Sequence, residues 1–183
     1  MILRAIKARA QDVSFVLATI KARAGRGVFR AADATRIGVL GHSLGGLTAA
    51  QVAAATSSVA CAADLAGSVY GDARRKPFRR PFLILDGSQR ESTLGGWWAN
   101  LAGTRYWVTL KAAKHLNFTD WSWLAPALRA SGLKPRIPNL GSIDGLRALA
   151  LERQYVSAFF DECLKHRATR AFDDRPPDVA VKR

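Results

Sequence analysis

The chain has 183 residues, of which 49% are hydrophobic, and this excludes a wholly disordered or fibrous protein and suits one folded domain. Its apolar runs fall far short of the ~20 residues that a membrane-spanning helix needs, so no membrane span is expected. With 28 Lys and Arg against 14 Asp and Glu, the formal net charge is +14. Such an excess of positive charge is compatible with binding to nucleic acid or anionic lipid. Because the basic residues are scattered in twos and threes, a solvated basic surface is the simpler interpretation, and no specific nucleic-acid partner is expected.

The cysteines and the N-terminus bear on the cellular compartment. Cys61 and Cys163 are too few for a disulfide framework and lack the spacing of a metal site, so both are expected to be small buried hydrophobic residues. Charged and polar residues from Lys7 onward interrupt any apolar segment of a signal peptide. The chain as given is therefore expected to be cytoplasmic, whereas a longer parent protein would be open to export.

The first half of the chain predicts a helix and two strand-containing units. Apolar residues recur at steps of three and four over residues 3–20, which predicts an amphipathic helix. The compact apolar run at residues 36–40 predicts a buried parallel strand, and the Ala-rich residues 44–55 predict a helix directly after it. Residues 58–63 predict a second strand that ends at Asp64, and the glycines and proline of residues 66–80 predict a loop.

The second half continues the alternation. Residues 81–85 and 105–110 predict two more strands, with a short helix at residues 97–101 between them. The aromatic and proline-containing residues 118–139 predict a loop and a short helix over the top of the domain. A long helix is predicted from residue 143 to about 165, and the basic, Pro-containing end is predicted to be a frayed tail. The expected division is a partial domain over residues 1–166 and a disordered tail over residues 167–183.

Strands that alternate with helices predict an α/β fold with a mostly parallel sheet. In such sheets, ligands and reactive groups gather at the carboxyl ends of the strands. Three residues that carry chemistry fall there, namely Ser43, Asp64 and His115.

Residues 41–45 read Gly-His-Ser-Leu-Gly and fit the pattern G-x-S-x-G. An apolar strand enters this motif and an Ala-rich helix leaves it, which is the context of a nucleophile elbow. In this turn the serine takes a strained conformation, and only a very small residue fits two positions before and after it. Ser43 is therefore the expected nucleophile, with the backbone N–H of Leu44 as one oxyanion donor. A glycine-rich turn that serves only packing, or that cradles phosphate, is the alternative.

A serine needs an adjacent base to act as a nucleophile. His115 follows the fourth strand and is the last of the three candidate residues, which matches the chain order Ser…Asp…His of these hydrolases. His42 precedes Ser43, and its side chain is expected to point away into the packing of the turn. His166 ends a helix, where it is expected to cap carbonyl groups. His115 is therefore the predicted general base.

The acid that orients the base is less sharply defined. Asp64 ends the strand that follows the elbow helix, whereas Asp86 ends the next strand and also suits an Asx turn with Gly87 and Ser88. A little further along, where many such hydrolases carry their acid, the chain offers residues 89–91, of which Glu91 is a carboxylate. Asp64 is favoured over Asp86, and Glu91 is the third choice.

Four segments together resemble the α/β-hydrolases, and more narrowly the isoform II type of platelet-activating factor acetylhydrolase with related bacterial lipases and acetylhydrolases. They are Gly-His-Ser-Leu-Gly-Gly at residues 41–46, Cys-Ala-Ala-Asp-Leu at 61–65, Lys-His-Leu-Asn-Phe-Thr-Asp at 114–120, and Ile-Asp at 143–144. The resemblance covers about residues 12–165 and implies Ser43, His115 and Asp64 as a catalytic triad.

The chain departs from this family before the elbow, where the family has several further strands and a His-Gly loop that donates the second oxyanion N–H. The sequence therefore resembles the C-terminal portion of such a hydrolase. An N-terminally truncated α/β-hydrolase fold with weak or no esterase activity is expected, because the loss of one oxyanion donor costs about 10²–10³ in rate.

The leading functional hypothesis is a serine ester hydrolase of the lipase or acetylhydrolase kind that acts on a small-molecule ester or lipid, with no metal or organic cofactor. Trp121, Trp123, Phe118 and Leu124 would form an apolar wall for an acyl chain, or else pack as a lid on the core. A dienelactone-hydrolase-like or peptidase activity is a less favoured alternative. A catalytically inactive remnant that binds anionic lipid or nucleic acid is another.

Overall fold

The computed structural model describes residues 2–68, 77–88 and 91–183. Within them a sheet has the strand order β1-β2-β3-β4-β5. Its members are β1 (Ile37–His42), β2 (Val59–Leu65), β3 (Phe82–Gly87), β4 (Arg105–Leu110) and β5 (Val179–Lys182). β1 to β4 pair in parallel, and β5 is antiparallel to β4. The helices are α1 (Ile2–Arg23), α2 (Leu44–Ala55), α4 (Glu91–Trp98), α5 (Trp121–Ala130) and α6 (Gly145–Lys165), with short 3₁₀ helices η1 (Gly27–Phe29) and η2 (His115–Phe118).

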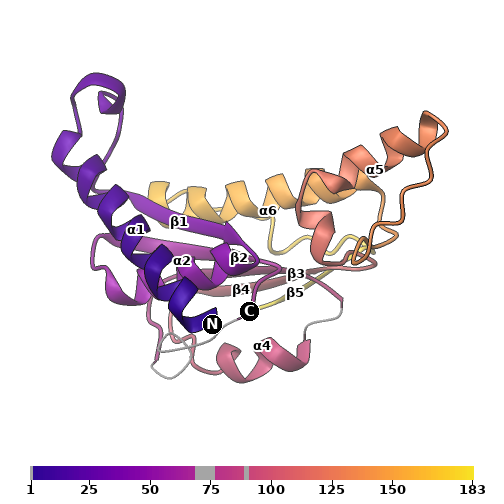
Figure 1. Cartoon of the computed structure of the whole chain (residues 1–183). Helices are drawn as coiled ribbons and strands as arrows, with labels where there is room; N and C mark the ends of the chain where they lie inside the picture. The colour runs from indigo at the N-terminus through magenta and orange to yellow at the C-terminus, as the bar shows by residue number, and fades with distance from the viewer. Residues whose placement is uncertain (1, 69–76, 89–90) are drawn as a thin grey trace.

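The sheet is covered on both faces (Figure 1). α1, α2 and α4 pack on one face and contribute Leu17, Ala50 and Trp97 to one buried apolar cluster, whereas α6 packs on the other face and contributes Leu151 and Phe159 to a second cluster. Because both faces are buried at the centre of the sheet, β2 and β3 are continuous apolar runs rather than alternating ones. The buried strand predicted at residues 36–40 is wrong in its burial, since β1 lies at the edge of the sheet and Leu40 is 52% exposed. The mixed α/β fold with a mostly parallel sheet is thus present.

Alternate residues of each strand point to opposite clusters. In β2, Ala62 belongs to the cluster under α2, whereas Cys61 and Ala63 belong to the cluster under α6. By the same alternation, Asp64 at the end of β2 points to the α2 side of the sheet. This placement brings the carboxylate of Asp64 under the start of α2.

The segment after α6 is ordered, in contrast to the frayed tail predicted for residues 167–183. It turns back along the sheet and ends as β5 beside β4. Phe172 is 1% exposed and stacks on the ring of Tyr106 with a centroid distance of 3.7 Å. The sequence did not predict this packing, because the apolar residues of the segment are single, widely spaced and set among charged residues.

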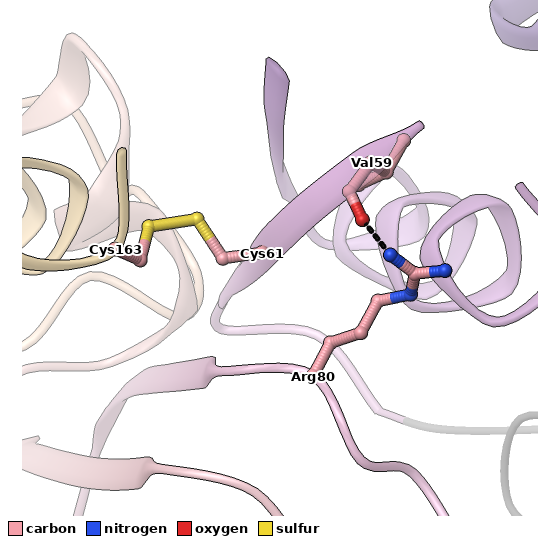
Figure 2. The surroundings of a disulfide bond; sticks show 4 residues. All are labelled: Val59, Cys61, Arg80 and Cys163. Carbon is pink, nitrogen blue, oxygen red and sulfur yellow. Dashed lines mark hydrogen bonds between the residues drawn. A yellow bond between two sulfur atoms is a disulfide. The ribbon is translucent and has the colours of Figure 1, made fainter. Parts of the chain in front are cut away.

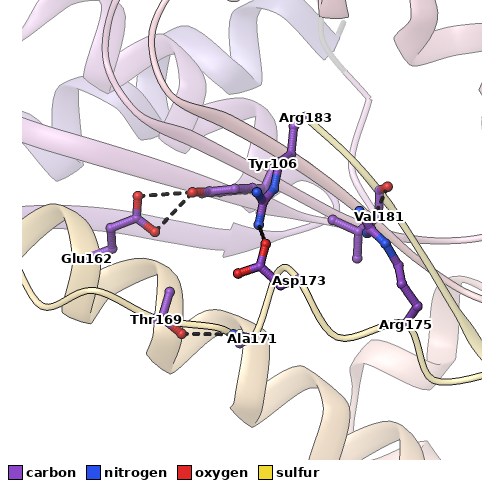
Figure 3. Close-up of polar contacts among 8 residues, drawn as sticks. All are labelled: Tyr106, Glu162, Thr169, Ala171, Asp173, Arg175, Val181 and Arg183. Atoms are coloured by element: carbon purple, nitrogen blue, oxygen red, sulfur yellow. Dashed lines mark hydrogen bonds and ion pairs between the residues drawn. The ribbon is translucent and has the colours of Figure 1, made fainter.

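Polar contacts fix the same segment (Figure 3). The hydroxyl of Tyr106 donates to the carboxylate of Glu162 at 3.0 Å, and burial together with this carboxylate raises the pKa of Tyr106 to about 12. Arg183 pairs with Asp173, and outside the view Arg147 pairs with Asp178. The pair of Arg147 and Asp178 thus ties the final residues to α6, whereas the hydrogen bond of Tyr106 to Glu162 joins β4 to α6 beneath them.

Cys61 and Cys163 are joined by a disulfide, which corrects the expectation of two separate buried thiols. Figure 2 shows the bond linking β2 to α6 across the sheet face. The two cysteines are 102 residues apart in the chain, so no local spacing pattern marks them as a pair. Nearby, Arg80 donates to the backbone carbonyl of Val59 and so ties the start of β3 to β2.

Within the described ranges, every helix is too short or too polar to cross a membrane. Of the loop predicted at residues 66–80, residues 69–76 lie outside the described part of the chain.

Candidate active site

Ser43 occupies the turn between β1 and α2, with φ 58° and ψ −120°. A positive φ is unfavourable for a residue with a side chain and costs about 1–3 kcal/mol. The turn is also tight: a Cβ on Gly41 would lie 2.2 Å from the backbone carbon of Gly45. The strand, strained turn and helix predicted from G-x-S-x-G are therefore present, and this contact explains the glycine two positions before Ser43. The expectation of an equally strict need for a very small residue two positions after Ser43 was wrong, because a Cβ on Gly45 would meet no heavy atom within 4 Å.

The elbow places Ser43 at the N-terminus of α2, of which Leu44 is the first residue. The first N–H groups of a helix have no acceptor within the helix, and they carry the positive end of its dipole. A negative charge that develops beside Ser43 is thus favoured here. Leu44 has the position predicted for an oxyanion donor.

Asp64 is completely buried at the end of β2. Its Oδ1 accepts a hydrogen bond of 2.9 Å from the N–H of Gly67. A Cβ on Gly46 would lie 1.7 Å from this oxygen, and a Cβ on Gly67 would lie 2.1 Å from it. The carboxylate is therefore enclosed by glycine backbone of α2 on one side and of its own loop on the other.

The loop that follows Asp64 contacts both the elbow and His115. The N–H of Ser43 donates to the carbonyl of Leu65 at 2.8 Å. Ala66 takes a left-handed conformation with φ 51°, and its carbonyl oxygen lies 3.1 Å from Nδ1 of His115. Residues 64–67 thus join the segments that carry the serine and the histidine.

The contact with Ala66 defines the protonation of His115, the first residue of η2. A carbonyl oxygen only accepts hydrogen bonds, so Nδ1 of His115 is the nitrogen that donates. In the neutral ring, Nε2 is then unprotonated. That tautomer is the one in which a histidine accepts a proton from a serine hydroxyl.

His42 does not point away from the site, in contrast to the prediction from sequence. Its ring lies against the ring of His115, with a centroid distance of 4.6 Å and an angle of 37° between the planes. Its Nε2 lies 3.1 Å from the carbonyl oxygen of His115. The prediction that His42 points away was wrong because a side chain at the end of β1 reaches the loop that follows β4. The position of His42 next to Ser43 in the sequence gives no indication of this contact.

The alternative acids lie further along the sheet. Asp86 is 2% exposed and accepts a 2.7 Å hydrogen bond from the N–H of Gly87, which accords with the turn predicted there. Glu91 begins α4, and residues 89 and 90 lie outside the described ranges. Gly87, the residue after Asp86, lies against the backbone of Ala113 and Lys114, the two residues before His115.

The segment after His115 is held by a side-chain bridge. Oδ1 of the buried Asn117 accepts from the N–H groups of Lys114 and Gly141, at 2.8 and 2.6 Å. Phe118 is buried, whereas Trp121 and Trp123 on α5 are 36% and 47% exposed. Leu124 is partly buried, so the predicted apolar group of four is split between the core residue Phe118, the intermediate Leu124 and two surface indoles.

Two open pockets flank the site. One of about 470 Å³ lies between α1, β1 and the start of α2, and the other of about 430 Å³ is formed by segments around Lys114. The lining residues of the first are Arg9, Asp12, Val13, Gly38, Val39, Leu40, Gly45, Thr48 and Ala49, and those of the second are Ser88, Ala112, Ala113, Lys114, Arg129, Leu140, Gly141 and Ser142. Within the part of the chain that the structure describes, no three His, Cys, Asp or Glu side chains gather as metal ligands would.

A twisted, mostly parallel sheet with a strained serine at the first strand-to-helix turn defines a hydrolase-like α/β fold. The chain is similar to the solved structure of a ferulic acid esterase from Streptomyces cinnamoneus, with a TM-score of 0.83 and 30% sequence identity. The match covers 98% of this chain and 55% of that chain, so the sequence spans about half the length of that esterase. No protein-family model matches the chain. No curated protein matches it by sequence either.

Proposed function

We propose that the chain is an esterase-type serine hydrolase in which Ser43, His115 and Asp64 form the catalytic triad. The proposal is supported by the likeness to a ferulic acid esterase over 98% of this chain. The observation that carries it is the loop of residues 64–67, which accepts from the backbone of Ser43 and from the ring of His115. Asp64 is preferred as the acid because it belongs to this loop.

In the proposed reaction, Ser43 Oγ attacks the carbonyl carbon of an ester and passes its proton to Nε2 of His115. The N–H of Leu44 stabilises the oxyanion at the N-terminus of α2. His115 returns the proton to the departing alcohol, leaving an acyl group on Ser43. Water, activated by the same histidine, then releases the acid and restores the serine.

The substrate class is proposed from two sources. The comparison esterase is named for ferulic acid, an aromatic acid, whereas the sequence resembles lipases and acetylhydrolases. The exposed rings of Trp121 and Trp123 offer apolar surface to either an aromatic or an aliphatic acyl group. We favour an ester of an aromatic acid, because the structural likeness extends along almost the whole of this chain.

The test compares hydrolysis of methyl ferulate, p-nitrophenyl acetate and p-nitrophenyl palmitate by the purified chain. We expect the ferulate ester to give the highest kcat/KM of the three substrates. Ser43→Ala abolishes this activity, whereas Ser57→Ala, which changes an exposed serine in the turn before β2, at the opposite end of that strand from Asp64, leaves it intact. Equal rates for wild type and Ser43→Ala would refute the proposal.

The alternative is an inactive remnant that binds a polyanion, and the net charge of +14 is the observation in its favour. Binding of this kind weakens steeply with salt. Affinity for anionic vesicles or for RNA that falls by orders of magnitude between 50 and 200 mM salt, together with no difference between wild type and Ser43→Ala in ester hydrolysis, would favour the remnant over the enzyme.

A further inference from the structure

His42 makes two different contacts with the proposed base. Its ring packs against the ring of His115, and its Nε2 lies 3.1 Å from the backbone carbonyl oxygen of the same residue. Both histidines are partly buried. The two residues are 73 positions apart in the chain, so the pairing is a product of the fold.

The proton positions follow from the acceptor. The carbonyl of His115 only accepts, so Nε2 of His42 carries the hydrogen and donates it. This N–H joins the last residue of β1 to the first residue of η2. Ser43 is the next residue after His42, and the bond therefore lies one residue from the proposed nucleophile.

We infer that His42 is a positioning residue that holds the His115 loop against the elbow. The inference rests on the proposed function, since it assigns His42 a part in presenting His115 to Ser43. Nucleophile and base lie on separate loops, and a displacement of about 1 Å between reacting groups costs about 10²-fold in rate. The N–H of His42 fixes the backbone from which the His115 ring projects.

The contact between the two rings restrains the rotation of the His115 ring about χ2. The carbonyl of Ala66 holds one edge of the His115 ring at Nδ1, and the ring of His42 packs at 4.6 Å between centroids. A ring held at one nitrogen and supported by a neighbouring ring has a restricted χ2 rotation, which keeps Nε2 directed to one place. The backbone bond and the ring contact thus act on the same base.

Two variants separate these contacts. His42→Phe keeps an aromatic ring and removes the N–H donor, whereas His42→Gln keeps an N–H donor at a similar reach and removes the ring. His166→Phe is the matched control, because His166 is exposed at the C-terminal end of α6, where its backbone N–H, not its ring, caps the helix. Thermal unfolding of all three checks that the fold is retained.

The first measurement is the rate of phosphonylation by a fluorophosphonate probe, resolved into the maximal rate and the half-saturating probe concentration. We expect His42→Phe to lower the maximal rate about 10- to 100-fold with an unchanged half-saturating concentration, and His42→Gln to restore it to within about threefold of wild type. A wild-type rate in His42→Phe, or an equal loss in both variants, would overturn the role of the N–H.

The second measurement needs no activity. Long-range ¹H–¹⁵N spectra of the histidine rings should show an Nε2–H tautomer for His42 and an Nδ1–H tautomer for His115 in wild type. In His42→Phe the His115 signals should move toward averaged tautomers, and in His166→Phe they should not move. A wild type that fails to react while showing this pattern refutes the proposed function, and what it retains is the restraint that His42 places on the His115 ring. Unchanged His115 signals in His42→Phe refute the positioning role.

Discussion

Asp64 illustrates how single residues fix the site. A fully buried carboxylate is costly unless it is hydrogen-bonded, and here it receives the N–H of Gly67 and lies against the backbone of Gly46. Gly46 belongs to α2, so the carboxylate supports the helix whose N-terminus faces Ser43. The residue therefore links the geometry of the elbow to the loop that contacts His115.

Gly46→Ala tests this arrangement. The added Cβ would lie 1.7 Å from Oδ1 of Asp64, which forces the carboxylate or the helix to move. We expect a loss of about 1–3 kcal/mol in the free energy of unfolding and at least a tenfold loss of phosphonylation rate. Urea denaturation and probe labelling measure the two effects.

Gly45→Ala is the matched control, since a Cβ there meets no heavy atom within 4 Å. It should stabilise the helix by about 0.5–1 kcal/mol through lower backbone entropy in the unfolded chain. If Gly46→Ala behaves like Gly45→Ala, the close packing of Asp64 against α2 is contradicted.

Two tyrosines give a second prediction at this scale. The hydroxyl of Tyr155 is buried and has no hydrogen-bond partner among the described residues, whereas that of Tyr106 donates to Glu162. A buried unsatisfied hydroxyl costs about 1–3 kcal/mol, so Tyr155→Phe should raise the free energy of unfolding by about 1 kcal/mol or leave it unchanged.

Tyr106→Phe should instead lower the free energy of unfolding, because it removes a hydrogen bond to a charged group, which contributes about 1.5–3 kcal/mol. Urea denaturation of both variants measures the two changes in the free energy of unfolding. A loss of 2 kcal/mol or more in Tyr155→Phe would mean that its hydroxyl is satisfied.

At the scale of elements, the disulfide is the main cross-connection. It joins β2, which carries Asp64 one residue before its end, to α6 on the opposite face from α2. Disulfides persist in oxidising compartments and are rare in the cytoplasm. Thiol titration of the purified, non-reduced chain should find no free thiol.

Removal of the bond should destabilise the fold. For a cross-link that closes about 100 residues, the chain-entropy model gives about 4.7 kcal/mol, and measured values are typically 2–4 kcal/mol. We expect Cys163→Ala, or reduction of the wild type, to lower the free energy of unfolding by about 2–4 kcal/mol. A reductant should not change the stability of Cys163→Ala further, and a drop on its addition would contradict the assignment.

The elements differ in how far the sequence predicts them. The strand at residues 105–110 and the helix at 44–55 coincide with β4 and α2, because an apolar run and an Ala-rich segment each have one clear interpretation. β5 was missed since four residues among charges carry little periodicity. The short helix expected at 97–101 lies earlier, at Glu91–Trp98, because buried Leu94 and Trp97 fix its packed face.

For the site, the motif around Ser43 predicted its strained turn, because a single pattern of glycines encodes that backbone. The contacts of His42 with His115 and of Ala66 with His115 were not predictable in this way. They depend on where the loops after β1, β2 and β4 meet, which the order of residues along the chain does not specify. The disulfide was missed for the same reason.

At the scale of the whole molecule, the two edges of the sheet differ. β5 is short and carries Lys182, with Arg183 directly after it, and charges of this kind discourage edge-to-edge pairing. β1 runs from Ile37 to His42 and has no strand partner on its outer side within the described residues. Leu40 on β1 is 52% exposed, and Phe15 on α1 is 72% exposed. This edge is the part of the surface most suited to association.

We therefore expect the purified chain to self-associate with rising concentration, and Leu40→Lys to reduce this association by placing a charge on the open edge. Ala180→Lys on β5 is the matched control and should have little effect. Sedimentation velocity at several concentrations measures both. Equal behaviour of wild type and Leu40→Lys would exclude the β1 edge as the contact.

The proposed reaction requires that the hydroxyl of Ser43 be activated by its neighbours in the folded chain. Intact-mass spectrometry after incubation with a fluorophosphonate, followed by peptide mapping, measures this directly. A single adduct on Ser43 that is absent in Ser43→Ala and lost in His115→Ala is the expected result. An unmodified Ser43 at saturating probe, or labelling that is unchanged in His115→Ala, would contradict the account.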